Sequence, residues 1–300
     1  MNTKIDLVVP YVNGLDPEWQ KIYKQYKEDI DFTRFDGHDI LKYVFRSIEK
    51  NIEWIGTIHL LVMQESQIPA WIDRSKVHIV YHKDFIPEKH LPVFNSSAFE
   101  MYLWNIPELS ENFIYINDDI LFNSTINVSD HFDENLNPLV TMTSIKYRDE
   151  RLSTDYAKTF IGSCNLAAKG TEYVPWNEEN NALLRPGHGP QAYRVSVLKA
   201  IYNEFKDEIE QSISKFRETY NYNQYLFSAY MFFHGLSDLK IPTYKYVGIT
   251  TKRRKIIMAY VFSRTKELCL NDIELTTVKD KIWLNTLLEL RFPNKCKYEI

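Results

Sequence analysis

One stretch of the chain, residues 113–122, restricts the fold more than any other. It reads Phe-Ile-Tyr-Ile-Asn-Asp-Asp-Ile-Leu-Phe, so Asn117, Asp118 and Asp119 lie between two apolar runs. Short apolar runs rich in Ile, Tyr and Phe are typical of a buried strand. Burying carboxylates at the end of such a strand costs free energy unless a cation offsets their charge. The cost is avoided if they lie in a solvated turn. The stretch therefore predicts either a Mg²⁺ and diphosphate site at a sheet edge or a polar turn.

Three more apolar runs predict strands, at residues 5–12, 58–63 and 77–81. The first run is almost continuously apolar, which is typical of a central parallel strand. Residues 18–30 and 41–51 lie between these runs and have the spacing of helices, the first of them an exposed one. Strands that alternate with helices predict a mostly parallel α/β sheet, in which ligands bind beyond the carboxyl ends of the strands.

Length and composition exclude several classes of protein. The 300 residues are 44% hydrophobic and 25% charged, which is typical of a folded soluble protein. A net charge of −4 argues against a protein that coats nucleic acid, so no nucleic-acid partner is expected. Three widely spaced cysteines favour a reducing compartment. No signal-peptide pattern is present, and no run reaches the roughly 18 apolar residues that span a bilayer, so we expect a cytoplasmic protein.

Two loops carry polar residues at positions where an anionic ligand can bind. Asn13 and Asp16 follow the first predicted strand, in a segment with the composition of a turn. Asn95 and Ser96 precede a predicted short helix, whose free N–H groups and dipole favour an anion. Each pattern is also that of an ordinary turn or helix cap, so neither loop alone decides between the two interpretations.

A histidine and an arginine supply groups that phosphate chemistry needs. His188 lies between two glycines and two prolines, at the predicted start of a helix. It is either a general base or phosphate ligand, or a surface histidine in a turn. Arg217 precedes an aromatic-rich helix predicted at residues 221–234, and it either binds phosphate or pairs with a carboxylate. A second Asn-Asp pair, Asn271 and Asp272, follows another apolar run.

The chain divides into three predicted parts that together form one catalytic unit. Residues 1–126 form the α/β core that binds a nucleotide sugar. Residues 127–184, with a predicted turn at 162–165, form an insert or connecting subdomain. Residues 185–300 are rich in helix and complete the site. The basic run 252–255 is either a solvated patch or a contact for an anionic membrane or polyanionic acceptor.

No motif supports a P-loop NTPase, a dinucleotide oxidoreductase, a serine hydrolase or a zincin. The chain contains no GxxxxGK[ST], GxGxxG, GxSxG or HExxH motif. Acidic turns, a histidine loop and an arginine on an α/β sheet suit phosphoryl or glycosyl transfer from a nucleotide sugar. Such chemistry needs a metal to offset diphosphate charge, donors for the transferred phosphate, and a base for the acceptor hydroxyl.

Four blocks of the chain, in order, resemble the Stealth proteins. This family of sugar-1-phosphate transferases includes bacterial capsule polymerases and the animal enzyme that makes the precursor of the mannose-6-phosphate tag. The blocks are residues 5–16; residues 34–49, 67–71, 91–96 and 113–122; residues 185–190 with Arg194; and residues 269–272. The resemblance covers nearly the whole chain. It departs at Asn13 and Ser97, where the family often has Asp and Asn; if the acid at the first position is essential, Asp16 would have to replace it.

The resemblance implies a glycosyltransferase-A-like α/β fold, with a mostly parallel sheet flanked by helices and a helical C-terminal part. It implies transfer of a hexose or N-acetylhexosamine 1-phosphate from a UDP-sugar to a hydroxyl of a polysaccharide or lipid-linked oligosaccharide, with release of UMP. The implied catalytic residues are Asp118, Asp119, His188 as general base, Arg217 and Asp272. The implied ligands of Mg²⁺ or Mn²⁺ are Asp118, Asp119 and Asp272. The implied substrate-binding residues are Asn13, Gly14, Asp16, Arg34, Asn95, Ser96, Asn117, Arg194 and Asn271.

Two other functions stay open on the sequence. A conventional glycosyltransferase of the same fold would release UDP instead of UMP. A module that binds sugar nucleotides or polysaccharides without turnover is the second, although the acidic pair and His188 argue against it. A lipid-linked acceptor would place the chain at the inner face of the plasma membrane, as a peripheral protein.

Overall fold

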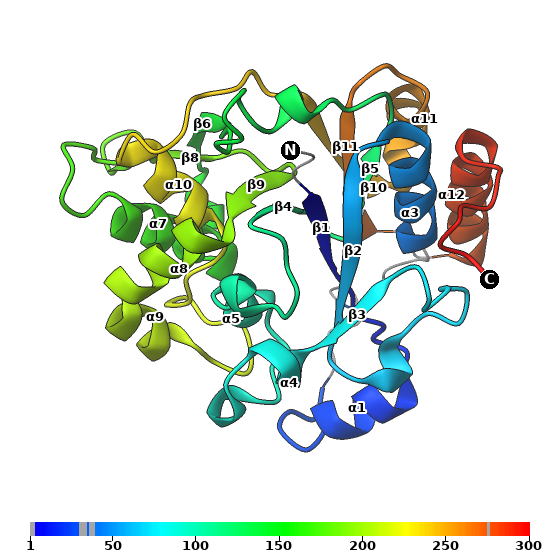
Figure 1. The fold of residues 1–300 in the computed structure, drawn as a ribbon, viewed down its shortest axis with the longest axis horizontal. Helices are drawn as coiled ribbons and strands as arrows, with labels where there is room; N and C mark the ends of the chain where they lie inside the picture. Colours follow the sequence, from blue (N-terminus) through cyan, green and yellow to red (C-terminus); the bar gives the residue numbers. More distant parts are fainter. Residues whose placement is uncertain (1–3, 30–34, 36–39, 275–276) are drawn as a thin grey trace.

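A five-stranded sheet forms the centre of the protein (Figure 1). The structure is a computed structural model that describes residues 4–29, 35, 40–274 and 277–300, with the backbone alone for 272–274. The strand order is β3-β2-β1-β4-β9; the first four strands are parallel and β9 is antiparallel to β4. The strands are β1 (Ile5–Pro10), β2 (Ile55–Val62), β3 (His78–Tyr81), β4 (Asn112–Tyr115) and β9 (Gln191–Arg194). The predicted α/β class with a mostly parallel sheet is confirmed.

Both faces of this sheet are covered, which explains why β1 is apolar except at Asp6. Leu7 and Val9 pack with α3 (Ile40–Asn51) in one hydrophobic cluster. Val8, which points to the opposite face, belongs to a second cluster that includes residues of helices from the middle and C-terminal thirds of the chain. Alternate side chains of one strand therefore enter two separate cores, as expected for a central parallel strand.

The stretch 113–122 is two strands, not one. β4 ends at Tyr115 within the central sheet, and β5 (Ile120–Phe122) belongs to a second sheet of order β10-β11-β5. The Ile120 N–H donates to the Asn117 carbonyl, so the chain turns at the acidic pair between the two sheets. The other strands of the second sheet are β10 (Tyr244–Thr250) and β11 (Glu267–Glu274). The C-terminal part, predicted to be rich in helix, therefore also supplies strands to two sheets.

The segment between β5 and β9 contains a third sheet, of order β6-β8-β7. Its strands are β6 (Met142–Lys146), β7 (Trp176–Asn177) and β8 (Ala182–Pro186), and α7 (Asp155–Ala167) lies between β6 and β7 in sequence. Residues 162–165 lie inside α7, so the predicted turn there was wrong. The helix continues because Thr154 caps its start and apolar side chains such as Phe160 and Cys164 bury one face.

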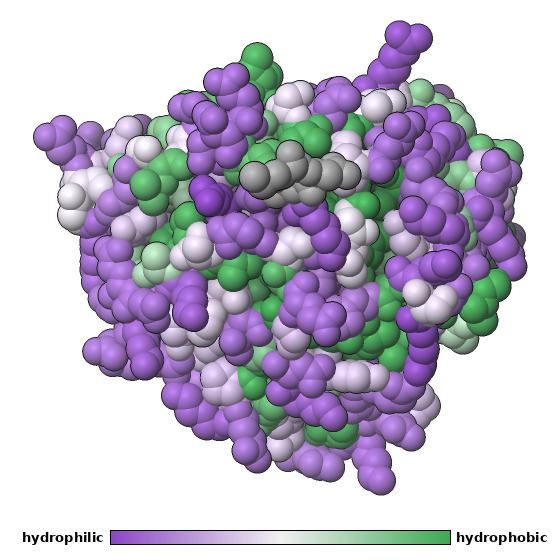
Figure 2. Space-filling view, in the orientation of Figure 1, coloured by the Kyte–Doolittle hydropathy of each residue, from purple (hydrophilic) through white to green (hydrophobic). Residues whose placement is uncertain are grey.

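The remaining helices surround the three sheets. They are α1 (Pro17–Tyr23), α4 (His82–Phe85), α5 (Ser96–Glu100), α6 (Asp149–Leu152), α8 (Val195–Glu204), α9 (Lys206–Ser212), α10 (Tyr225–Phe233), α11 (Arg254–Val261) and α12 (Val278–Arg291). The helix predicted at 18–30 is shorter than expected and not fully exposed, since Trp19 and Tyr23 are buried against Phe94. No helix in the described part of the chain has the length and hydrophobicity to cross a membrane. Figure 2 shows hydrophilic residues over most of the visible face, with apolar residues in smaller patches between them.

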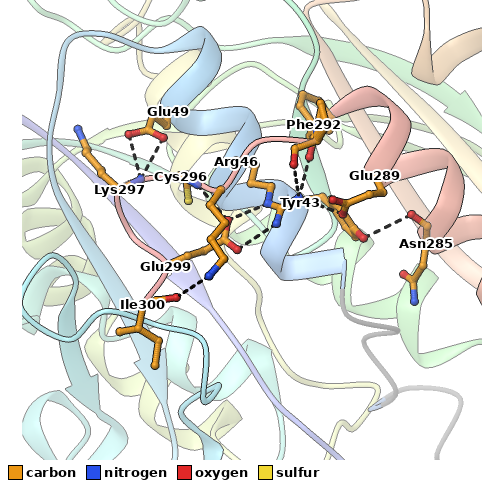
Figure 3. A network of polar contacts seen from close by, with 12 residues as sticks. Tyr43, Arg46, Glu49, Asn285, Glu289, Phe292, Cys296, Lys297, Glu299 and Ile300 are labelled. Carbon is orange, nitrogen blue, oxygen red and sulfur yellow. Dashed lines mark hydrogen bonds and ion pairs between the residues drawn. The ribbon is translucent and has the colours of Figure 1, made fainter.

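A buried arginine attaches the C-terminal tail to α3 (Figure 3). Arg46 binds Glu299 through two nitrogen–oxygen contacts of 2.7 and 3.1 Å, and it also binds Glu289 at 3.0 Å and the Phe292 carbonyl at 2.8 Å. The side chains of Arg46 and Glu299 are only 5% and 3% exposed. Arg46 therefore has a structural role in the described part of the chain, as the buried cation of two ion pairs.

We expect Arg46→Ala to lower the free energy of unfolding by about 3 kcal/mol, because it leaves the buried Glu299 carboxylate without its cation. Urea denaturation followed by circular dichroism measures the change. Arg74→Ala is the matched control: its ion pair with Glu65 is 55% and 61% exposed, so a loss below about 1 kcal/mol is expected. Equal losses in the two variants would contradict the role of Arg46.

Candidate active site

The acidic pair lies where β4 leaves the central sheet. Asp118 and Asp119 are both partly exposed. Burial raises the pKa of Asp118 from 3.8 to about 6. Within the described part of the chain, no basic side chain forms an ion pair with Asp118. This position therefore favours either a protonated carboxyl group or a bound cation.

The second Asn-Asp pair lies beside the first. β11 is antiparallel to β5, with Cys269 opposite Ile120. The ladder continues at the acidic pair, where the Leu270 N–H donates to the Asp119 carbonyl at 2.9 Å. The next residues along β11 are Asn271, which is partly exposed, and Asp272, whose side chain lies outside the described residues. Two segments that are 150 residues apart in sequence, as Asp119 and Cys269 are, thus meet at one edge.

His188 reaches the same edge from a different element. The His188 ring contacts the ring of Tyr246 in β10 at a centroid distance of 5.4 Å. Tyr246 pairs with Cys269 of β11, which in turn pairs with Ile120, directly after the acidic pair. The Gln191 amide donates to the carbonyls of Gly187 and Gly189, at 3.0 and 2.8 Å, and so holds the loop that carries His188. The Tyr225 hydroxyl lies 2.7 Å from His188 Nδ1. The expected helix start at this loop was wrong, because β9 pairs with β4 before α8 begins.

Glycine is required at position 187 by close packing. A Cβ atom there would lie 2.6 Å from the Tyr244 hydroxyl oxygen and 2.7 Å from its ring. The loop before His188 is therefore pressed against Tyr244, and any larger residue must displace one of the two.

We expect Gly187→Ala to destabilise the protein by about 1–3 kcal/mol and to lower turnover, because it displaces the His188 loop. Gly162→Ala is the matched control: its nearest atom, in Tyr222, would lie at 3.6 Å, and it is inside α7. Replacing a helical glycine stabilises by roughly 0.5–1 kcal/mol. Thermal unfolding of the two variants should therefore change in opposite directions, and the same direction for both would contradict this account.

Arg217 lies close to α5. Its Nη2 donates to the Ser96 hydroxyl at 2.9 Å. Glu100, one turn further along α5, is buried and accepts from the Tyr115 hydroxyl at 3.2 Å and from the Gln224 N–H at 2.9 Å. Burial raises the pKa of Glu100, and the nearby charge of Arg217 opposes this. Arg217, Ser96 and Glu100 therefore form one polar cluster on the side of β4 that also carries Tyr115.

Sequence reasoning missed three residues that support the site, namely Glu100, Gln191 and Tyr225. The spacing of Ser96 and Glu100, four residues apart on a predicted helix, placed them on one face and was an available signal. No local pattern pointed to Gln191 or Tyr225, because their partners Gly187 and His188 become neighbours only through strand pairing and helix packing.

Several predicted substrate contacts are occupied by structural bonds. Asp16 caps α1 and accepts from Ser66 and Gln67; burial alone would raise its pKa, but these hydrogen bonds outweigh burial and lower it. Asn95 is buried, caps α5 and binds Asn221. These side chains have few remaining hydrogen-bonding positions for a nucleotide.

The residues beside Asp16 have similar roles. The Asn13 backbone binds the Gln67 side chain, and Asn13 Oδ1 accepts from the Leu15 N–H. A Cβ atom at Gly14 would lie 2.5 Å from the Cβ of Phe35, so this glycine permits close packing. The contacts of Asn13, Gly14, Asp16 and Asn95 with substrate stay predictions.

Two predicted site residues are not brought to this edge. Arg194 pairs with Asn112 at the opposite end of β4 from Asp118 and binds Glu111 at 3.3 Å. Arg194 was predicted to bind substrate together with residues 185–190. Its position conflicts with that prediction, because β9 runs away from the loop that contains His188. Arg34 lies outside the described residues.

The oxygen ligands at the edge suit a hard divalent cation. Asp118 and Asp119 supply two carboxylates, and burial raises the pKa of Asp118. Among described side chains, no group of three potential ligands converges on one point. Asp272, whose backbone follows this pairing on β11, is the predicted third ligand.

Comparison with known proteins gives one family and several relatives. The model of Stealth protein conserved region 2 matches residues 34–140, which include the acidic pair. A capsular polysaccharide phosphotransferase of Streptococcus pneumoniae is 27% identical, with 100% of both chains aligned. An exopolysaccharide phosphotransferase of Lactiplantibacillus plantarum is 27% identical over 98% of this chain and 96% of its own. A capsular polysaccharide phosphotransferase of Haemophilus influenzae is 29% identical over 91% of this chain and 79% of its own.

Proposed function

Because this chain belongs to the Stealth protein family, we propose that it is a phosphotransferase of capsule or exopolysaccharide synthesis. It transfers a sugar 1-phosphate from a UDP-sugar to a hydroxyl of a polysaccharide or lipid-linked oligosaccharide. The observation that supports this proposal is the pairing of β11, which leads into Asn271 and Asp272, beside the acidic pair Asp118–Asp119. The His188 loop packs on Tyr244 and Tyr246 of the adjacent strand β10. The proposal includes a glycosyltransferase-A-like arrangement of the nucleotide site at this edge.

The bonds that change follow from the proposed products. The acceptor oxygen attacks the β-phosphorus of the donor and forms the new phosphodiester bond. The bond between that phosphorus and the oxygen bridging to the α-phosphate breaks, and UMP leaves. A Mg²⁺ or Mn²⁺ ion held by Asp118 and Asp119, with Asp272 as a further ligand, would offset the diphosphate charge. Arg217 would donate to the non-bridging phosphate oxygens, and its contacts with Ser96 and Glu100 would orient it.

His188 is the titratable group that we assign to the reacting phosphate or the acceptor hydroxyl. It is partly exposed, contacts Tyr246 in the strand beside β11, and is held through Gln191 and Tyr225. The sequence predicts that His188 is the general base for the acceptor hydroxyl, and that assignment is part of the proposal.

A screen of UDP-sugars with and without candidate acceptors tests the function. Release of UMP together with a ³¹P resonance of a new phosphodiester is expected. Release of UDP would instead identify a conventional glycosyltransferase. Binding of UDP-sugar with neither product, for every acceptor and with Mg²⁺ or Mn²⁺ present, would indicate a binding module. The controls are the Asp118→Asn chain and a reaction without metal.

Contact with an anionic membrane surface is a further part of this proposal, because a lipid-linked acceptor lies at the inner face of the plasma membrane. Residues 251–266 contain six basic residues and no acidic one. Lys252, Arg253 and Lys255 are exposed, and Ile256, Met258 and Phe262 on the same segment are 51, 48 and 49% exposed. An exposed surface with basic and large apolar side chains is typical of peripheral membrane binding.

We expect the chain to sediment with vesicles that contain anionic lipid and to remain in solution with neutral vesicles. Replacing Lys252, Arg253 and Lys255 by Glu should weaken this binding at least about tenfold, because each basic residue near the surface contributes about 1 kcal/mol. The matched control replaces Lys21, Lys24 and Lys76, which are exposed elsewhere, by Glu. Equal weakening by both triple variants would show a general charge effect and contradict a docking surface.

A further inference from the structure

The contact between Tyr225 and His188 fixes more than the position of the imidazole ring. Tyr225, in the first turn of α10, is 4% exposed, and its hydroxyl oxygen lies 2.7 Å from His188 Nδ1. In a neutral histidine one ring nitrogen carries a hydrogen and the other is an acceptor. The direction of this hydrogen bond therefore determines which nitrogen of His188 carries the proton.

The hydroxyl of Tyr225 must be the donor. Burial raises the pKa of Tyr225 well above its ordinary value, so the phenol is protonated. His188 Nδ1 is the one hydrogen-bond partner that the described residues offer to this hydroxyl. A buried hydroxyl that does not donate costs about 1–3 kcal/mol. The favoured arrangement is therefore O–H donating to Nδ1, with the imidazole proton on Nε2.

A stack of side chains holds Tyr225 in this orientation. Its ring stacks on Phe160 at a centroid distance of 4.6 Å and an interplanar angle of 27°. The guanidinium of Arg185 lies over the Phe160 ring, 4.2 Å from its centroid. Arg185 is 6% exposed and forms no ion pair with a carboxylate among the residues described. Its uncompensated positive charge near Tyr225 strengthens the phenol as a hydrogen-bond donor.

We propose that the Tyr225 hydroxyl fixes neutral His188 as the tautomer with its proton on Nε2, so that His188 acts as a hydrogen-bond donor to a phosphoryl oxygen. Tyr225 is then a positioning residue that acts through His188. A neutral His188 in this tautomer has no lone pair on Nε2 to accept the proton of an attacking hydroxyl. The donor role replaces the general-base assignment, and the proton of the acceptor hydroxyl leaves on the phosphate of UMP. The donor role rests on the proposed function, but the tautomer does not.

Nuclear magnetic resonance of the full chain labelled with ¹⁵N-histidine tests the tautomer directly. Long-range ¹H–¹⁵N correlations distinguish the two neutral tautomers, and loss of one pattern in His188→Gln assigns His188 among the eight histidines. We expect the Nε2–H pattern in the wild type and its loss in Tyr225→Phe. Tyr246→Phe, which alters another ring in contact with His188, should retain it.

A wild-type spectrum with the Nδ1–H pattern would overturn the proposal, even if Tyr225→Phe failed to fold. So would an unchanged Nε2–H pattern in a folded Tyr225→Phe chain. Neither reading requires catalytic turnover, so failure of the proposed function is seen separately, as absence of UMP release by the wild type.

The donor role has its own test in the transfer assay. The Gln amide in His188→Gln can still donate a hydrogen bond, whereas the side chain in His188→Ala cannot. Because loss of one donor to a developing phosphate or oxyanion charge costs roughly 100-fold or more, we expect His188→Gln to retain at least about tenfold more activity than His188→Ala. Equal loss in both variants would overturn the donor role.

Discussion

Asp118→Asn is expected to lower transfer by about 1,000-fold or more, because the amide removes a charge that the proposed metal–diphosphate complex needs. UMP release from the UDP-sugar with the highest wild-type rate measures the loss. The matched control is Asp207→Asn, an exposed carboxylate in the first turn of α9, whose rate should not change. A folded Asp118→Asn chain with a rate near that of the wild type would remove Asp118 from the site.

The same variant should be more stable than the wild type at neutral pH. Burial raises the pKa of Asp118 from 3.8 to about 6, so the folded state binds a proton more tightly than the unfolded chain. The stability that this proton supplies is complete below the unfolded pKa and is lost as the pH rises through the folded pKa. In metal-free buffer, Asp118→Asn should gain about 1–3 kcal/mol at neutral pH, with the difference disappearing in acid. Urea denaturation of the wild type and the variant, at neutral pH and in acid, measures the difference in free energy of unfolding. The same difference under both conditions would contradict the raised pKa of Asp118.

Arg217→Gln is expected to lower transfer by about 1,000-fold, since a guanidinium that binds a transferred phosphoryl group typically contributes that much. Arg217→Lys keeps the charge but not the planar pair of donors, so its loss should be intermediate. Turnover at saturating donor, with the dissociation constant of the UDP-sugar measured separately, distinguishes loss of chemistry from loss of binding.

Arg194→Gln is the matched control for Arg217. Both arginines were predicted site residues, yet Arg194 lies at the opposite end of β4 and pairs with Glu111. We expect its loss to change turnover less than about threefold, as for a surface ion pair. A larger effect of Arg194 than of Arg217 would reverse the assignment and place the phosphate site at the other end of the strand.

The central sheet was predictable because its signals are local. Near-continuous apolar runs arise where a strand is buried on both faces, and the clusters around Leu7 and Val8 show that both faces are covered. The turn predicted at 162–165 was wrong because helix capping by Thr154 and burial of Phe160 outweigh the weak preference of Gly162 and Ser163 for a turn. The strand β9 was missed because its four residues form a strand only through pairing with β4.

The sequence by itself determined which chemical groups this protein carries: the acidic pair, the second Asn-Asp, the His188 loop and an α/β core. These follow from residue type and short-range spacing. Only the tertiary structure decided which groups meet. The register of β9 on β4 takes Arg194 away from Asp118, and the pairing of β11 with β5 places Leu270, the residue before Asn271, against Asp119. The contact of His188 with Tyr246 brings its loop to β10 of the same sheet. Strand register between distant segments is set by long-range packing, and local sequence carries almost no information about it.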